Sequence, residues 1–266
     1  VPEFDGIDEV LDPLIEWRNR QGHKVTVVHV ANNANRGVIQ GVISDAYESE
    51  NPVEFVALVG DAAQAEFTII AATNTGDYRY TLLDGNDQLP DFAIGRLSCN
   101  NLNQLELIVN KLVDYETAPY MDDTDWFKQG AVVAGAQVNG LGTVLLARYV
   151  RRNLYKIGFN EVRAWLHNVD GNIPVGQPQP FLTNAMEWGI SVLSYRAYQL
   201  MNRLPLNEIY GYDNSDGRLP VVLAITCNTG DFVIRDAHTE AWLRAEGGGI
   251  GAIGTATAGT NPRFNN

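Results

Sequence analysis

With 266 residues, the chain is long enough for one large domain or two smaller ones, and its 45% apolar and 19% charged residues are typical of a globular protein. Its formal net charge of −13 argues against nucleic acid as a partner, because a phosphate backbone demands clustered lysine and arginine. Two cysteines make neither a disulfide framework nor a metal-ligand pattern, and no apolar run approaches the roughly 18 residues of a membrane span.

The first half of the chain alternates helical and strand patterns. Apolar residues recur at helical spacing in three segments, 7–15, 38–47 and 102–113. Short apolar runs, typical of buried strands, occupy the segments 25–30, 55–59 and 92–94. The acidic residues Asp122, Asp123 and Asp125 follow and form the best linker candidate. We therefore expect an amino-terminal α/β subdomain over residues 1–121.

The second half of the chain repeats this alternation. Strands are expected at 131–134, 162–166, 190–195, 221–225 and 250–255. Helices are expected at 144–155, 181–188 and 237–245. Strands that alternate with helices predict a mostly parallel sheet with helices on both faces. The predicted fold class is therefore α/β, with a second subdomain over residues 126–266.

Cys227 lies where α/β enzymes carry their chemistry. It follows the predicted strand 221–225 within the turn sequence 226–232, which places it at the carboxyl end of a strand. A cysteine in an apolar region is often only a packing residue, as we expect for Cys99. The polar, glycine-containing turn around Cys227 instead favours a nucleophile. Since a free thiol has a pKa of about 8.5, a cysteine hydrolase normally supplies a neighbouring base.

Three residues could assist this cysteine. Tyr198 follows the neighbouring predicted strand, but a tyrosine with an ordinary pKa of about 10 is a poor base at pH 7. Arg196 would favour the thiolate if its side chain turned inward, although we expect it to point to solvent, as most arginines do. His238 begins the last predicted helix, where a capping or surface role is expected and a role as substitute base is left open.

No cofactor is expected. The string 249–254 matches the dinucleotide pattern G-x-G-x-x-G, but a helix precedes it and a strand carries it, which is the reverse of the fingerprint. Asp84, Asp87 and Asp91 could bind a structural calcium ion, yet their spacing matches no calcium loop. A solvated turn is therefore the expectation for these aspartates.

The chain resembles the gingipain family of cysteine peptidases, which have a caspase-like fold. The similarity rests on segments that occur in the same order as in the family, namely 12–17, 58–61, 84–87, 94–98, 226–232 and 240–243. It covers nearly the whole chain and implies two α/β subdomains, a Cys–His dyad, cleavage after basic residues in the best-known members, and export. We therefore expect a secreted or cell-surface protein that acts on peptides or proteins and accompanies other domains of a larger protein.

The resemblance also implies which positions form the site. Cys227 matches the nucleophile, whereas Tyr198 stands at the position of the dyad histidine. Gln199 replaces the glycine whose backbone N–H would join that of Cys227 in the oxyanion hole. Gln137 replaces the carboxylate that orients the histidine. Loss of a positioned base typically lowers a rate by about 10² to 10⁴.

The resulting prediction is a gingipain-like cysteine endopeptidase domain with impaired activity, assisted by Arg196 or His238. The alternative is a non-catalytic pseudopeptidase that binds peptides or neighbouring domains through the former cleft. A cysteine-only transpeptidase of the secretion-sortase type is a third interpretation within the same family.

Overall fold

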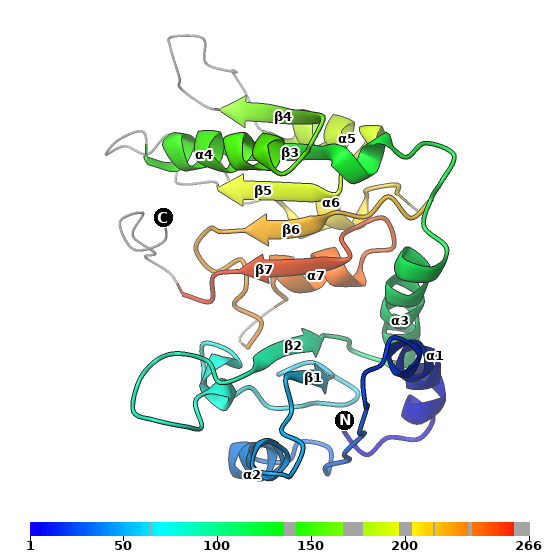
Figure 1. Ribbon diagram of the computed structural model, residues 1–266, viewed down its shortest axis with the longest axis vertical. Coiled ribbons are helices and arrows are strands. Elements are labelled where there is room, and N and C mark those ends of the chain that lie inside the picture. The colour runs from blue at the N-terminus through cyan, green and yellow to red at the C-terminus, as the bar shows by residue number, and fades with distance from the viewer. Residues whose placement is uncertain are drawn as a thin grey trace. The chain divides into compact units, whose positions relative to one another are not determined.

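A computed structural model of the chain describes residues 1–63, 65–135, 142–166, 178–196, 204–214, 216–233 and 236–257. The chain divides into two compact units, whose elements are labelled in Figure 1. Unit 1 comprises residues 1–113 and 231–235, and unit 2 comprises residues 114–230 and 236–266. The predicted limits of the two α/β subdomains, 1–121 and 126–266, stay a prediction.

Unit 1 is built on a two-stranded parallel sheet. Its elements are α1 (Ile7–Arg20), α2 (Arg36–Tyr47), β1 (Phe55–Val59), a 3₁₀ helix (Tyr78–Thr81), β2 (Ala93–Leu97) and the first part of α3 (Leu102–Thr117). β1 and β2 pair in parallel from Phe55 opposite Ala93 to Val59 opposite Leu97. The apolar faces of α2 and β1 meet in one core with the residues Ile39, Ile43, Leu58, Ile69, Tyr80 and Phe92. These helices and strands confirm the elements predicted for the first half, except the strand at 25–30.

Arg96 ties the loops of unit 1 to strand β2. Its guanidinium makes two 2.8 Å hydrogen bonds to the carboxylate of Asp77 and donates to the carbonyls of Gly60 (2.9 Å) and Ile69 (2.8 Å). It also lies over the ring of Phe232, 5.3 Å from the centroid. A buried charge is tolerated when it is paired and hydrogen-bonded, and Arg96 meets both conditions.

The predicted strand at 25–30 is wrong. This segment forms only an isolated bridge, between Val30 and Pro2, and Val28 is 41% exposed. The bridge consists of hydrogen bonds from the Val30 N–H to the Val1 carbonyl (2.9 Å) and from the Glu3 N–H to the Val30 carbonyl (2.8 Å). The apolar run therefore has the composition of a strand, but among the described residues it pairs with none of the named strands.

Unit 2 contains a five-stranded, fully parallel sheet in the order β4-β3-β5-β6-β7. Its strands are β3 (Gln129–Ala134), β4 (Glu161–Leu166), β5 (Val192–Arg196), β6 (Val221–Ala224) and β7 (Gly251–Gly254). Its helices are α4 (Gly142–Lys156), α5 (Gln179–Trp188), α6 (Leu206–Tyr210), α7 (His238–Arg244) and a 3₁₀ helix (Asp125–Lys128). The strands and all helices except α6 and the 3₁₀ helix were predicted.

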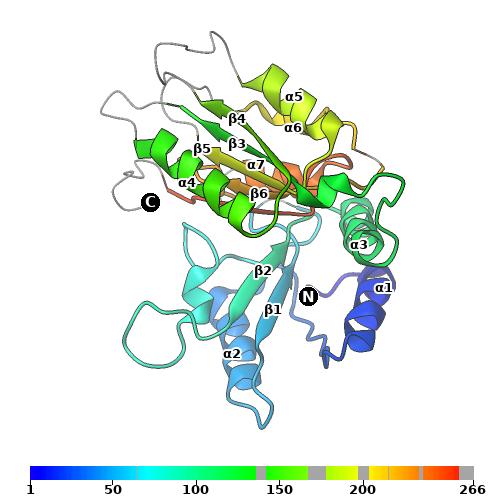
Figure 2. The same ribbon diagram turned by 45° about the horizontal axis from the view of Figure 1, so that its top comes forward.

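Helices cover both faces of this sheet (Figure 2). Every residue of the interior strand β3 is buried, and alternate residues point to opposite faces. Val132 and Ala134 pack against α4, whereas Ala131 and Val133 belong to the core that includes residues of α5, α6 and α7. Burial on two faces explains why β3 is a continuous apolar run.

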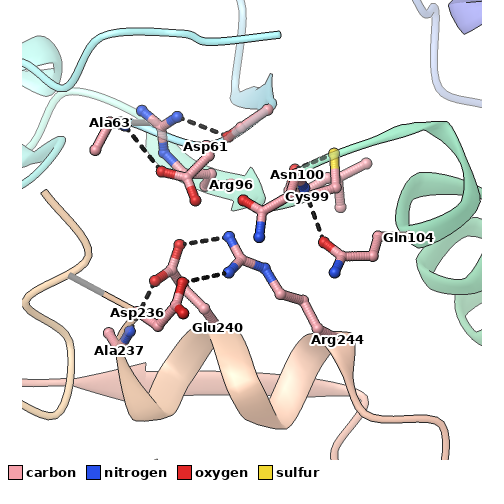
Figure 3. A network of polar contacts seen from close by, with 12 residues as sticks. Asp61, Ala63, Arg96, Cys99, Asn100, Gln104, Asp236, Ala237, Glu240 and Arg244 are labelled. Atoms are coloured by element: carbon pink, nitrogen blue, oxygen red, sulfur yellow. Dashed lines mark hydrogen bonds and ion pairs between the residues drawn. The ribbon is translucent and has the colours of Figure 1, made fainter. Parts of the chain in front are cut away.

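Helix α7 is fixed by a buried ion pair (Figure 3). Arg244 binds Glu240 at 2.8 Å, with side chains that are 1% and 3% exposed, and also binds Asp236 at 3.1 Å. The Glu240 carboxylate accepts the backbone N–H of Ala237 at 2.8 Å, which satisfies a donor at the start of the helix. These bonds thereby fix the first turns of α7.

Candidate active site

The turn after β6 holds Cys227 at the carboxyl edge of the sheet in unit 2. β6 ends at Ala224, and the chain then turns sharply, with Asn228 in the left-handed region at φ 58°. Asparagine enters this region more readily than most residues. Cys227 is half-buried, whereas Cys99 is fully buried in unit 1 and donates weakly to the Leu97 carbonyl at 3.4 Å. Cys99 is thus the packing residue that was expected, and Cys227 is the more accessible thiol.

Hydrogen bonds to β6, to the residue directly after β7 and to the first turn of α7 fix this turn. The carbonyl of Thr226 accepts the backbone N–H of Thr229 at 3.2 Å and lies 2.7 Å from the Thr229 hydroxyl. The Thr229 hydroxyl also reaches the carbonyl of Ala224 in β6. The hydroxyl of Thr255, directly after β7, donates to the Thr226 carbonyl as well. Finally, the Thr229 carbonyl accepts the N–H of Thr239, in the first turn of α7, at 3.0 Å.

Strand β7 packs so closely on the turn that only glycine fits at two positions. A Cβ on Gly230 would lie 2.9 Å from the backbone carbon of Gly254. A Cβ on Gly254 would lie 2.8 Å from the Gly230 nitrogen and 2.7 Å from Cγ2 of Thr239. The string 249–254 follows α7 and runs into β7, as predicted. Its last glycine serves close packing against the Cys227 turn.

Sheet topology brings the carboxyl ends of the strands that precede the predicted site residues to one edge of the sheet. The strand order reverses between β3 and β5, and the carboxyl ends of both strands adjoin, with Ala134 opposite Arg196. Ligands of open α/β sheets bind at such reversal points. Gln137 follows β3 in the sequence, and Tyr198 and Gln199 follow β5, but all three lie outside the described residues. Their roles stay predictions.

The expectation that Arg196 points to solvent is wrong. Arg196 ends β5, which lies between β3 and β6, and is only 3% exposed. Its Nη1 donates to the carbonyl of Ile225, two residues before Cys227. A strand flanked on both sides leaves its last side chain among the carbonyl ends of its neighbours, and here Nη1 has the Ile225 carbonyl as its acceptor. The structure therefore places the guanidinium of Arg196 beside the backbone segment that leads to Cys227.

His238 is engaged by a backbone carbonyl. It is the first residue of α7, is partly buried, and its Nε2 lies 2.6 Å from the Leu204 carbonyl. A carbonyl only accepts, so Nε2 carries the proton in this bond. Any role of His238 as a base is thus restricted to Nδ1 while the bond persists, and that role stays a prediction.

Tyr195 is a second tyrosine of this region, three residues before Tyr198, and its environment is described. It is 5% exposed in β5, opposite Ala224 of β6. Burial raises the pKa of Tyr195, which a hydrogen bond with the Leu204 backbone opposes only in part. Tyr195 therefore remains protonated at neutral pH and is no base for Cys227.

The aspartates considered for calcium stabilise a turn in unit 1. The backbone N–H groups of Asp84 and Leu83 donate to Asp91 at 2.9 and 2.7 Å, and these bonds lower the pKa of Asp91. Asp84 accepts the N–H of Gly85, and Asp87 accepts that of Leu89. Asp84 and Asp87 are exposed, and the hydrogen bonds of all three aspartates are to the backbone of their own turn.

The threonines that hold the Cys227 turn were not identified from the sequence. The available signal was weak, because threonine hydroxyls commonly bond to nearby backbone in turns. It could have indicated Thr229, which is close to Cys227 in the chain. It could not have indicated Thr255, which contacts Thr226 from 29 residues away.

Comparison with solved structures shows the same fold. The crystal structure of the Arg-specific cysteine proteinase gingipain R matches with a TM-score of 0.79 at 23% identity, over 92% of this chain and 59% of that one. A complex of the pro- and mature domains of the Porphyromonas gingivalis enzyme RgpB matches with a TM-score of 0.77 at 22% identity, over 93% of this chain and 60% of that one. The fold is therefore the predicted caspase-like α/β architecture, with parallel sheets flanked by helices.

Sequence comparisons agree with the fold. Gingipain R2 of Porphyromonas gingivalis strain W83 is 23% identical over 254 residues, which are 90% of this chain and 33% of the relative. Gingipain R1 of Porphyromonas gingivalis is 24% identical over 248 residues, or 88% of this chain and 24% of the relative. The chain thus spans a third or less of these relatives. The model of peptidase family C25 matches residues 3–266, and the chain belongs to this family, as its resemblance to gingipains predicted.

Proposed function

We propose that the chain is a thiol-dependent peptidase domain of low turnover, with Cys227 as its nucleophile. The observation that carries this proposal is the position of Cys227, half-buried on a hydrogen-bonded turn at the carboxyl end of β6. A nucleophile needs a fixed approach to the reacting carbonyl, and this turn restricts the backbone on both sides of the thiol. Membership of a peptidase family agrees with this role.

Arg196 supports the same proposal. A thiol beside a positive charge is more readily deprotonated, and a guanidinium keeps its charge at any physiological pH. The guanidinium of Arg196 binds the carbonyl of Ile225 in the peptide segment that enters the turn. It would raise the share of thiolate without acting as a base, which suits a site that lacks the dyad histidine.

Low turnover follows from Tyr198 and Gln137. A tyrosine in place of the dyad histidine cannot take a proton readily at pH 7, and a glutamine in place of the orienting carboxylate carries no charge to hold an imidazolium. Without a positioned base, we expect rates about 10² to 10⁴ below those of an intact dyad.

The substrate class is an extended peptide. The structural relative is an Arg-specific proteinase, which makes basic residues the first choice for the position before the cleaved bond. Action outside the cell, as a secreted or surface protein, is part of the proposal and rests on the family resemblance. Within the described residues, every helix is too short or too polar to cross a membrane.

A second candidate function is a pseudopeptidase that binds protein without cleaving it. The observation in its favour is Tyr198 itself, since loss of the base removes catalysis while leaving the cleft. The complex of pro- and mature domains of RgpB makes a neighbouring protein domain a reasonable occupant of such a cleft.

Turnover of a mixed peptide library distinguishes the two functions. The native chain and Cys227→Ala are incubated with the library, and cleavage is followed by mass spectrometry. Slow cleavage by the native chain alone supports the peptidase. Absence of cleavage by both, with retained binding of library peptides, supports the pseudopeptidase. The variant Tyr198→His with Gln137→Asp should gain activity if the dyad is the principal loss.

A further inference from the structure

The carbonyl of Thr226 is the most heavily bonded acceptor in the Cys227 turn. It accepts the Thr229 N–H at 3.2 Å, lies 2.7 Å from the Thr229 hydroxyl, and accepts the Thr255 hydroxyl. The single proton of the Thr229 hydroxyl is shared with the Ala224 carbonyl, and its oxygen accepts the N–H of Thr255 at 3.3 Å. The hydroxyls of Thr229 and Thr255 are therefore both hydrogen-bonded to the carbonyl of the peptide group between Thr226 and Cys227.

That peptide group carries the backbone N–H of Cys227. The bond between Thr226 and Cys227 is trans, and in a planar trans peptide the C=O and the N–H point in opposite directions. Fixing the Thr226 carbonyl toward Thr229 and Thr255 therefore directs the Cys227 N–H to the opposite side. Donors on a carbonyl also polarise its peptide, which strengthens the N–H as a donor.

We infer that Thr229 and Thr255 are positioning residues that aim the Cys227 N–H at the oxyanion formed when Cys227 is acylated. The inference rests on the proposed function. In the step concerned, the thiolate sulfur forms a bond to the carbonyl carbon and the carbonyl π electrons move to oxygen. The Cys227 N–H donates to this oxyanion, which then collapses and expels the leaving group. An oxyanion-hole donor of this kind is worth about 10² to 10³ in rate.

The packing around the turn supports a positioning role. Thr229 is only 1% exposed and Thr226 only 6%, so water does not compete for these bonds. The close approach of Gly254 to Gly230 keeps β7, and with it Thr255, against the turn. The hydroxyls are thus held in place by the same contacts that hold the cysteine.

Two reactions of the same thiol test the inference. Acylation by an N-acyl-arginine p-nitrophenyl ester passes through an oxyanion and releases p-nitrophenolate. Alkylation by iodoacetamide displaces iodide at carbon and forms no oxyanion. Both rates are measured at Cys227 by mass spectrometry, which separates it from Cys99, in the native chain and in Thr229→Val and Thr255→Val. Thr229→Ser and Thr255→Ser retain the hydroxyl and serve as matched controls.

The expected result is a loss of acylation of tenfold or more in each valine variant, with alkylation within about threefold of native and both serine variants near native. Equal losses in both reactions, or no loss of acylation, would overturn the inference while leaving the nucleophile intact. If the native thiol is alkylated but never acylated, the proposed peptidase fails and the inference falls with it. If Thr229→Val does not fold, the same two rates measured for Thr255→Val and Thr255→Ser, at a half-buried position, provide the test.

Discussion

The buried guanidinium of Arg196 donates to the carbonyl of Ile225, two residues before Cys227 in the chain. This contact joins the ends of two adjacent strands, β5 and β6. Because the guanidinium is buried at the end of β5, its position relative to the thiol is set by the sheet. Any effect of this charge on the thiol therefore depends on the fold.

Replacing Arg196 should reduce the reactivity of Cys227. In Arg196→Met the charge is lost, and we expect iodoacetamide alkylation at pH 7 to slow by roughly tenfold, because less thiolate forms. Arg196→Lys keeps a charge and should lose less. Circular dichroism verifies that both variants fold. Alkylation of Arg196→Met at the native rate would show that the guanidinium does not act on the thiol.

The close contact between β7 and the turn predicts different effects for two glycines of one strand. Gly254→Ala should destabilise the chain by about 1 to 3 kcal/mol, since the new Cβ would lie 2.7 Å from Thr239 and 2.8 Å from Gly230. Gly251→Ala is the control, because nothing lies within 4 Å of its Cβ position. Urea unfolding measures both, and similar values for the two variants would refute this account.

The buried pair in α7 should show strong coupling. Arg244→Met leaves the carboxylate of Glu240, whose side chain is 3% exposed, without its main partner. Removal of one member of a buried pair costs about 3 to 5 kcal/mol. The double variant Arg244→Met with Glu240→Leu removes both charges and should recover most of this loss in urea unfolding. Additive losses would contradict the coupling.

Stability should fall in strongly alkaline solution. Burial, followed by the charge of Asp77, raises the pKa of Tyr80 to about 12, although Arg96 opposes the shift. An unfolded tyrosine titrates near pH 10, so the neutral Tyr80 contributes its full stabilisation below that pH and loses it as the pH rises through about 12.

Urea unfolding at pH 8, 10 and 11 tests this dependence. Tyr80→Phe loses the 2.8 Å hydrogen bond to the Ile70 carbonyl, which costs about 1 kcal/mol at pH 8. Its stability should then decline less steeply above pH 10 than that of the native chain. Burial also raises the pKa values of Tyr195 and Tyr212, so some decline should remain. Parallel curves for the two proteins would exclude Tyr80 as a contributor.

Most elements of the fold were predictable from hydrophobic periodicity. The run that became β3 is apolar because both of its faces are buried, and α4 presents Val144, Ala147 and Leu154 to the sheet at helical spacing. The segment 25–30 has the composition of a strand, but a strand also needs a partner, which composition does not specify. Among the described residues its bridge joins Val30 to Pro2, outside the named strands.

The site was predictable only where residues are near one another in the chain. The position of Cys227 after a strand followed from the apolar run and the turn residues. Burial of Arg196 depends on the order of the strands, because it follows from β5 lying between β3 and β6. The contact of Thr255 with Thr226 depends on the register of β7, and no local pattern encodes it.

The bonds on the Thr226 carbonyl come from residues outside the dyad. The backbone of the Cys227 turn is therefore fixed by contacts that also join the turn to β6 and to the end of β7, whether or not the chain is catalytic. Under the proposal that Tyr198 stands at the dyad position, the turn would keep Cys227 in place for as long as the sheet folds. A single Tyr198→His substitution would then return a base to a site whose cysteine is already positioned.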